Sequence, residues 1–341
     1  MKKQNIILII ALLIFSFYNL NSQICQFAES IAGTGSDFIK SSSFDNMNNL
    51  YVAGTFASWT LNFNNDISVA RGWSGNTGFI AKYNIEGICQ WAERIDGNIT
   101  NISIKSGNDN SIYIAGSFIY DTIFFNNTIF LTNSGENDGF IAKYNTEGIC
   151  QWAERIDGNN SDYISGIDVD NEGNVAVTGK YSSILLNFNN EIELNGSGSI
   201  GEPNIFIAKY NTDGNCLWAE KITTNFTCNA IGVYFDSFGD IVLGGDFWSQ
   251  TILFNNGISL QRYGGLFGAN NVFFAKYNNE GICQWAKRVA GYGASFLEGM
   301  FLDSQNNIYL SGRSNCPTLE FNNGVSLALN GGYDSFFSKF N

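Results

Sequence analysis

The chain has 341 residues, of which 44% are hydrophobic, 15% are aromatic and 14% are charged, and it has a formal net charge of −13 with no histidine. The negative charge repels phosphate groups, which argues against nucleic acid and anionic membrane surfaces as partners. The absence of histidine excludes Ser-His-Asp and Cys-His catalysis and imidazole metal sites.

The first 22 residues have the pattern of a signal peptide. Lys2 and Lys3 precede an apolar stretch from Ile6 to Phe17, and Ser22 is a small residue suited to cleavage. That stretch is shorter than the ~20 residues that a membrane-spanning helix needs. We therefore predict that residues 23–341 form a single domain without a membrane span, which is secreted, periplasmic or at the cell surface.

The rest of the chain consists of five copies of one repeat. Residues 78–98 recur at 139–159 with a single change, Ile85 to Thr146. A Cys-x-aromatic element places its aromatic residue at Phe27, Trp91, Trp152, Trp218 and Trp285. A Phe-x-x-Lys element begins at Phe79, Phe140, Phe206, Phe273 and Phe336. Self-similarity at a fixed period is the signature of a repeat architecture.

Within one copy the hydrophobic residues alternate with a period of two, which predicts strands. In the third copy, residues 164–169 and 174–179 flank a polar turn and form a first hairpin. Residues 186–188 and 192–194 flank Asn189 and Asn190 and form a second, shorter hairpin. Residues 206–210 and 216–220 form the last two strands, and no segment of the copy predicts a helix.

Antiparallel units of four strands repeated at this spacing predict an all-β, five-bladed β-propeller. A solenoid or a string of sandwiches is the alternative. Residues 24–31 match the outer strand of a copy. Asn341 directly follows the strand that, in the other copies, precedes the outer strand. We therefore predict that the N-terminal strand pairs with the C-terminal blade and closes the ring, which leaves no sheet edge exposed.

The repeat combines Phe-x-x-Lys-aromatic-Asn, a tryptophan and a hydrophobic-Tyr-hydrophobic-x-Gly stretch at residues 50–54, 112–116 and 308–312. This pattern resembles the SBBP β-propeller repeats of exported bacterial proteins, and the resemblance implies a Bacteroidetes or flavobacterial-like source. The family is usually described as seven-bladed, whereas this chain has five copies. The resemblance implies no single activity.

The candidate ligand-binding residues are the asparagine pairs in the short hairpins. They are Asn64, Asn65, Asn126, Asn127, Asn189, Asn190, Asn255, Asn256, Asn322 and Asn323. Their amides can donate and accept hydrogen bonds, and nearby aromatic residues can stack on sugar rings. Those residues are Trp59, Trp73, Tyr120, Tyr181, Trp248 and Tyr263. The alternative interpretation is that Asn-Asn only suits a tight turn.

Other candidate sites have structural alternatives. The repeated Lys82-type residues can bind a ligand or pair across strands with Glu93, Glu154 and Glu220. We predict no cofactor, because Asp168-x-Asp170 resembles a calcium loop but lacks its final glutamate, and Asx turns explain these aspartates. The repeated cysteines are expected to be buried thiols one blade apart, and Cys228 and Cys316 are a further possible pair.

We predict a non-enzymatic binding or scaffold protein that contacts extracellular glycan or protein through repeated rim sites. One alternative is a carboxylate-dependent glycoside hydrolase or lyase acting in the channel, for which Asp162, Asp168 and Glu298 are the asymmetric acids. The other alternative is a purely structural cell-surface repeat protein.

Overall fold

The computed structural model describes residues 25–72, 75–125, 129–196, 203–264, 269–321 and 324–341. Within these ranges the chain forms 27 strands and no helix, so the predicted all-β class is confirmed. The described part of the chain accordingly contains no helix that is long and apolar enough to cross a membrane. The predicted signal peptide lies outside the described residues.

Each sequence copy forms one unit. Each of units 1 to 4 has an inner hairpin, a short side hairpin and two further strands, and unit 5 has one further strand in the described residues. Unit 1 contains β1 (Asp37–Phe44), β2 (Leu50–Phe56), β3 (Thr60–Asn62), β4 (Ser68–Ala70), β5 (Thr77–Tyr83) and the first half of β6 (Cys89–Ser106). Unit 2 contains the second half of β6, β7 (Ile112–Phe125), β8 (Ile129–Thr132), β9 (Asn137–Tyr144) and β10 (Cys150–Ile156).

Units 3 and 4 repeat this order, and unit 5 repeats it as far as the strand before the last. Unit 3 contains β11 (Asp162–Val169), β12 (Val175–Tyr181), β13 (Leu185–Asn187), β14 (Glu193–Asn195), β15 (Asn204–Tyr210) and β16 (Cys216–Ile222). Unit 4 contains β17 (Cys228–Phe235), β18 (Ile241–Phe247), β19 (Thr251–Leu253), β20 (Ser259–Gln261), β21 (Asn271–Tyr277) and β22 (Cys283–Gly291). Unit 5 contains β23 (Ser295–Leu302), β24 (Ile308–Ser314), β25 (Thr318–Glu320), β26 (Ser326–Ala328) and β27 (Asp334–Phe340).

The strands of unit 3 form an antiparallel sheet in the order β11-β12-β15-β16. Units 1, 2 and 4 repeat this pairing, and unit 5 repeats its first three strands. The repeated glycine of the second strand is required by a close approach of the backbone. A Cβ on Gly179 would lie 1.8 Å from the carbonyl oxygen of Tyr163 and 2.8 Å from the ring of Phe206. The β-bulge between Ile164 and Gly166 brings the inner strand to this position.

The core lies in apolar clusters that extend from one unit into the next. One cluster joins Ile80 of unit 1 to Ile102 and Phe140 of unit 2, all with at most 1% exposure. Indole groups add a polar tie between units, since Trp91 Nε1 donates to Thr146 O at 2.9 Å. The equivalent tryptophans of units 2 and 3, Trp152 and Trp218, make the same bond to the next unit.

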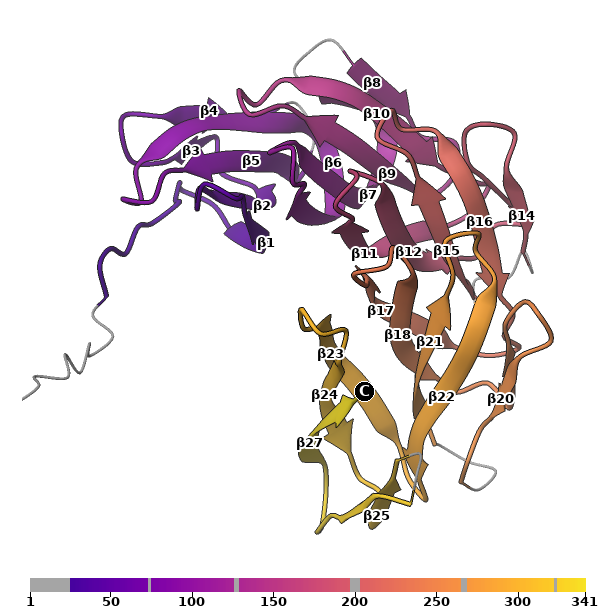
Figure 1. Cartoon of the computed structure of the whole chain (residues 1–341). Coiled ribbons are helices and arrows are strands. Elements are labelled where there is room, and N and C mark those ends of the chain that lie inside the picture. The colour runs from indigo at the N-terminus through magenta and orange to yellow at the C-terminus, as the bar shows by residue number, and fades with distance from the viewer. Residues whose placement is uncertain (1–24, 73–74, 126–128, 197–202, 265–268, 322–323) are drawn as a thin grey trace, which may run out of the picture.

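The units follow one another along an arc whose ends do not meet (Figure 1). In the described residues, β27 pairs with β24 alone, and residues 25–31 form no strand. The N-terminal segment is instead held beside unit 1, where Ala32 and Asn62 exchange backbone hydrogen bonds at 3.2 and 2.9 Å. The predicted ring closure is therefore not made in this structure, because the packing between successive units leaves the arc open.

Candidate functional site

Three of the predicted asparagine pairs lie in the described residues, at the turns of the side hairpins, where their side chains bind their own unit. Asn65 and Asp66 have left-handed φ values of 60° and 57°, as in a tight hairpin turn. Asn64 Nδ2 donates to Gly87 O at 2.7 Å, and Asn64 Oδ1 accepts from Cys89 N at 2.7 Å. The pair thus fastens its hairpin to the turn before the outer strand.

Units 3 and 4 repeat this arrangement through Asn189, Asn190, Asn255 and Asn256. Four of the predicted residues, Asn126, Asn127, Asn322 and Asn323, lie outside the described residues. In the described turns the amide groups bind backbone groups, which favours the turn interpretation. Ligand binding by these residues stays a prediction.

Three of the five repeated lysines form ion pairs with aspartates of the inner-hairpin turns. The pairs are Lys143–Asp109 at 3.5 Å, Lys209–Asp170 at 3.8 Å and Lys276–Asp236 at 2.7 Å. The predicted Lys–Glu cross-strand pairing does not match the register, because Lys209 lies opposite Trp218 and Glu220 lies opposite Ile207.

The aspartates of the inner-hairpin turns form Asx turns, in which the side chain accepts hydrogen bonds from backbone N–H groups of the same turn. Asp170 Oδ1 accepts from Glu172 N at 2.9 Å and from Asn174 N at 2.8 Å. Within the described ranges, no group of three or more Cys, Asp or Glu side chains is placed to hold a metal ion. None of the seven cysteines, all of which lie in the described residues, forms a disulfide, so Cys228 and Cys316 are not paired, and Cys25 is the exposed one.

Asp162 and Asp168 lie too far apart to form the carboxylate pair of a glycoside hydrolase. Asp162 and Asp168 both lie on β11, separated by about 20 Å of extended chain. A glycosidase pair needs a separation of about 5 to 10 Å. Asp168 forms an ion pair with Lys105 at 2.7 Å, and the exposed Glu298 forms one with Arg313 at 3.0 Å.

A different carboxyl group, that of Asp246, lies close enough to Glu298 for the charge of Glu298 to affect its pKa. Asp246 is 3% exposed, and burial raises its pKa to about 6 against the opposing hydrogen bonds from Asn229 and Asn270. Glu298 raises the same pKa further. The sequence signal for Asp246 is its position after the repeated glycine, where the other copies have Thr55, Ser117, Lys180 and Arg313.

Exposed aromatic residues gather at the connections between strands, at the end of the units opposite to the asparagine turns. Asn64 binds Cys89 at the start of β6, whereas Arg94, about 16 Å further along that strand, donates to Ala70 O beside Arg71. These connections contain Trp59, Phe226, Trp248, Tyr292, Tyr333 and the half-buried Tyr263. With Tyr120 on β7 and the half-buried Phe296 on β23 they are here called the aromatic rim.

Arginine side chains accompany several residues of the aromatic rim. The guanidinium group of Arg71 lies 4.2 Å from the centre of the Trp59 ring, and Trp59 remains 73% exposed. Arg71 Nη1 also donates to Ala57 O at 2.8 Å, which holds the guanidinium in place. In unit 4, Arg262 occupies the equivalent position and donates to Trp248 O at 2.9 Å.

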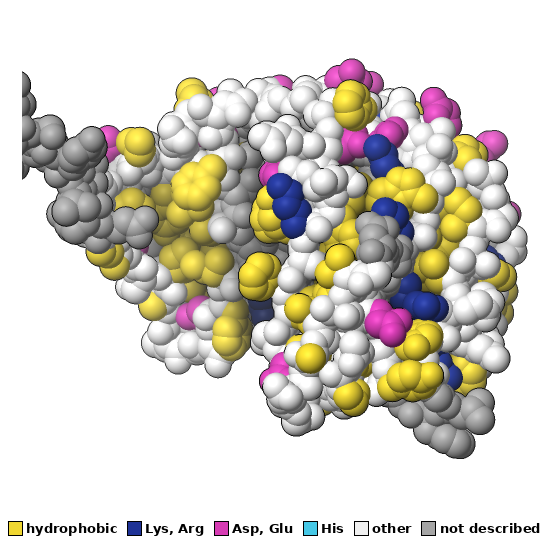
Figure 2. All heavy atoms as spheres, turned by 60° about the horizontal axis from the view of Figure 1, so that its bottom comes forward, with side chains coloured by type: hydrophobic (Ala, Val, Ile, Leu, Met, Phe, Trp, Pro, Cys, Tyr) yellow, Lys and Arg dark blue, Asp and Glu magenta, His cyan; other side chains and the backbone are white. Residues whose placement is uncertain are grey.

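Two further aromatic pairs lie near the C-terminal end of the arc. Tyr263 and Tyr292 have ring centres 5.1 Å apart, with Arg288 at 5.3 Å from Tyr263. Phe296 and Tyr333 both lie near Arg313, at 5.0 and 5.5 Å. Figure 2 shows hydrophobic side chains spread over one face of the molecule, with basic side chains beside several of them.

The aromatic residues predicted to lie near the asparagine turns are, where described, at the opposite end of the units or buried, so that part of the prediction was wrong. Tyr120, Trp59 and Trp248 are exposed, but Tyr181 is fully buried and its hydroxyl donates to Asn195 O. Trp73 lies outside the described residues. Sequence reasoning missed Phe226, Tyr292, Phe296 and Tyr333, because three of them stand in connections that do not align between copies.

Comparison with known proteins supports a propeller-like repeat organisation. No family model matches the chain. The uncharacterized WD repeat-containing protein L264 of Acanthamoeba polyphaga mimivirus is 24% identical, over 93% of this chain and 27% of that protein. The chain thus spans about a quarter of the length of this relative. The resemblance to SBBP repeats stays a prediction.

Solved structures give weaker likenesses. A protein of unknown function from Dyadobacter fermentans DSM 18053 is 11% identical, covers 89% of this chain and 86% of its own, and has a TM-score of 0.43. The mannose phosphorylase MPT-4 from Leishmania mexicana is 8% identical, covers 84% of each chain and has a TM-score of 0.37. Likenesses at these scores define no activity.

Proposed function

We propose that this protein is a non-enzymatic binding module that attaches to extracellular glycan through its aromatic rim. The observation that carries the proposal is the recurrence of exposed aromatic rings beside arginines at the same end of several units. The faces of such rings stack on the C–H faces of sugars, and the guanidinium groups donate hydrogen bonds to hydroxyl groups.

Repetition along the arc favours weak sites that act together. A long polysaccharide that contacts two or more platforms binds more tightly than one platform allows, because the second contact is intramolecular. Acids pair with some of the arginines at this rim, since Arg94 lies 3.5 Å from Asp96 and Arg313 lies 3.0 Å from Glu298. An extracellular protein with an exposed acidic surface is the alternative partner, and a purely structural cell-surface role is a further one.

The proposal includes the finer features predicted from the sequence. Residues 1–22 act as a signal peptide, residues 23–341 form one five-bladed propeller domain, and the protein is exported to the periplasm, cell surface or medium. The alternating strands, the repeat period and the WD-repeat relative support this fold. The blade that unit 5 begins is completed by a strand with the sequence of residues 24–31.

An array of polysaccharides and oligosaccharides, followed by titration calorimetry on any binder, tests this function. Trp59→Ala and Tyr292→Ala are each expected to weaken binding by about two- to tenfold, the usual contribution of one stacked ring. The matched control is Phe238→Ala, because Phe238 is 80% exposed but lies in an inner-hairpin turn at the opposite end. Equal binding by all three variants would refute the assignment to the aromatic rim.

The hydrolase or lyase alternative is tested with the same glycans. Release of reducing ends by the wild-type chain, together with its loss in Asp246→Asn and Glu298→Gln, would replace the binding proposal with an enzymatic one. We expect no turnover by the wild-type chain, and unchanged glycan affinity in Asp246→Asn, because this carboxyl group belongs to no aromatic platform. Glu298→Gln removes the ion pair with Arg313, which lies beside Phe296 and Tyr333, so this variant is used for turnover alone.

A further inference from the structure

Successive units meet through one repeated apolar contact. A residue of the third strand in one unit shares a buried cluster with a residue of the inner strand in the next unit. The four pairs are Ile80 with Ile102, Ile141 with Ile164, Ile207 with Ala230, and Phe274 with Leu297. Each of these side chains is at most 4% exposed, so the contact excludes water wherever two units join.

The two ends of the arc carry unmatched halves of this contact. By strand register, Phe337 on β27 has the position of Ile80, and Ile39 on β1 has the position of Ile102. Phe337 is 85% exposed and Ile39 is 54% exposed. The C-terminal face therefore offers the surface that a following unit normally covers, and the N-terminal face offers the surface that a preceding unit normally covers.

The unit at the C-terminal end also lacks a strand. In units 1 to 4 the third strand pairs with an outer strand that begins with cysteine, but β27 has no such neighbour in the described residues. Residues 25–31 have the outer-strand sequence and form no strand. They lie where the outer strand of a preceding unit would lie, because Phe27 packs on Gly87 as Trp91 packs on Gly148.

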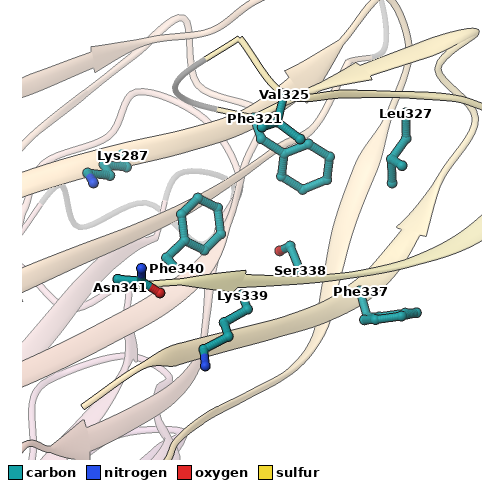
Figure 3. A pocket seen from close by; sticks show the side chains of 9 residues that line it. All are labelled: Lys287, Phe321, Val325, Leu327, Phe337, Ser338, Lys339, Phe340 and Asn341. Atoms are coloured by element: carbon teal, nitrogen blue, oxygen red, sulfur yellow. The ribbon is translucent and has the colours of Figure 1, made fainter. Parts of the chain in front are cut away.

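A hollow marks the place of the missing strand. It has a volume of about 340 Å³ and is lined by residues of β22, β26, β27 and the turn of the last side hairpin (Figure 3). Phe321 and Phe340 line it and correspond to Phe63 and Tyr83 of unit 1. In unit 1 those two residues share a cluster with Cys89 of the outer strand. The hollow therefore has the lining against which an outer strand that begins with cysteine packs.

We propose that β27 of one chain receives residues 25–31 of a second copy, so that chains associate head to tail. The new junction repeats the contact that joins units within a chain, with Phe337 of one copy against Ile39 of the next. The expected register puts Ser338 opposite Ala28, as Ala81 lies opposite Ala92.

The occupant is a second copy because the two faces of one chain lie at separate ends of an open arc (Figure 1). Closing that arc within one chain would change the packing at every junction between units. Tethering favours an intramolecular contact only where the geometry permits it. Docking of a second copy leaves each chain unchanged, and contacts of this head-to-tail kind produce rings or open filaments.

Sedimentation velocity on the full chain tests this association. The wild-type chain is expected to exceed the monomer mass increasingly with concentration, whereas Phe337→Asp and Ile39→Asp chains remain monomers. A mixture of the two variants is expected to form dimers, because each variant keeps one intact face. Phe238→Asp is the matched control and is expected to associate like the wild type, since Phe238 is 80% exposed and lies in unit 4.

A monomeric wild-type chain across its soluble range would overturn the proposal. Protection of the β27 amides from hydrogen exchange in that monomer would identify closure within one chain as the alternative. Association that persists in both face variants would also overturn it, and would point to the apolar N-terminal run that both variants retain.

Cysteine cross-linking distinguishes the two sources of the strand. Opposed residues of antiparallel strands have Cα separations of about 4.5 to 5.5 Å, which a disulfide can bridge. With Cys25→Ser as the background, chains with Ala28→Cys and chains with Ser338→Cys are expected to form linked dimers when mixed. A chain with both substitutions that links only within itself would refute the assignment to a second copy.

Discussion

Replacement of Asp162 by asparagine is expected to stabilise the protein at neutral and alkaline pH. Asp162 is 1% exposed, and burial raises its pKa from 3.8 to about 7, despite hydrogen bonds from Ser182 and Ser183. Its Oδ1 accepts from both serine N–H groups and its Oδ2 accepts from Ser183 Oγ at 2.7 Å. Asparagine can keep the first two bonds through its oxygen, and its amide can donate to the rotating hydroxyl.

The size of the effect follows from the pKa difference. The folded state holds the proton more tightly than the unfolded state, so the stability from this group is complete below the unfolded pKa and is lost as pH rises through about 7. A difference of about three units corresponds to about 4 kcal/mol at full ionisation. The uncharged asparagine avoids this loss, so its advantage over aspartate should grow between about pH 4 and about pH 8.

Urea unfolding followed by tryptophan fluorescence measures this difference. The free energies of unfolding of wild-type and Asp162→Asn chains are compared at about pH 4 and about pH 8, where the group is protonated and ionised, respectively. The low-pH pair is the internal control for changes in hydrogen bonding. A difference between the two chains that stays constant with pH would show that ionisation of Asp162 carries no cost.

Three further substitutions or reagents probe the repeat itself. Gly179→Ala is expected to lower the free energy of unfolding by more than about 2 kcal/mol, because its Cβ would lie 1.8 Å from a carbonyl oxygen. Gly332→Ala is the control in the same urea titration and should be neutral, because no atom lies within 4 Å of its Cβ. Asn189→Ala should cost about 1–3 kcal/mol, measured by the midpoint of thermal unfolding, because it leaves the Cys216 N–H without its acceptor. A thiol reagent should modify Cys25 alone in the folded protein, because the other cysteines are buried and burial raises the pKa of one of them, Cys216, to about 12. Mass spectrometry counts the modified thiols, and more than one before unfolding would contradict this.

The local structure of the units could be predicted because the same hydrophobic alternation and turn residues recur in every copy. Alternation along residues 164–169 predicted β11, and its side chains are alternately buried and half-buried in the structure. The tight turn at Asn189 and Asn190 was also predictable, since the second of these residues has a left-handed φ of 61°. Repetition made these features readable from a single sequence.

Features that depend on differences between copies could not be predicted in the same way. Tyr292 and Tyr333 stand in connections without counterparts, so their place on the aromatic rim depends on three-dimensional proximity. Asp246 is buried by unit packing that no local pattern records. Whether the ends of the arc meet depends on the sum of small rotations between successive units, and the residues of one unit determine only one of those rotations.

The indole tie between units has a consequence for how the array changes in length. Trp91 supplies the donor at one repeat position, and Thr146 supplies the acceptor at another position of the following copy. Duplication of any stretch one repeat long therefore creates a new donor and a new acceptor together, and deletion removes both. The near-identity of residues 78–98 and 139–159 is the trace expected of such an event. Recombination can thus lengthen or shorten this protein by whole units while every junction keeps its chemistry.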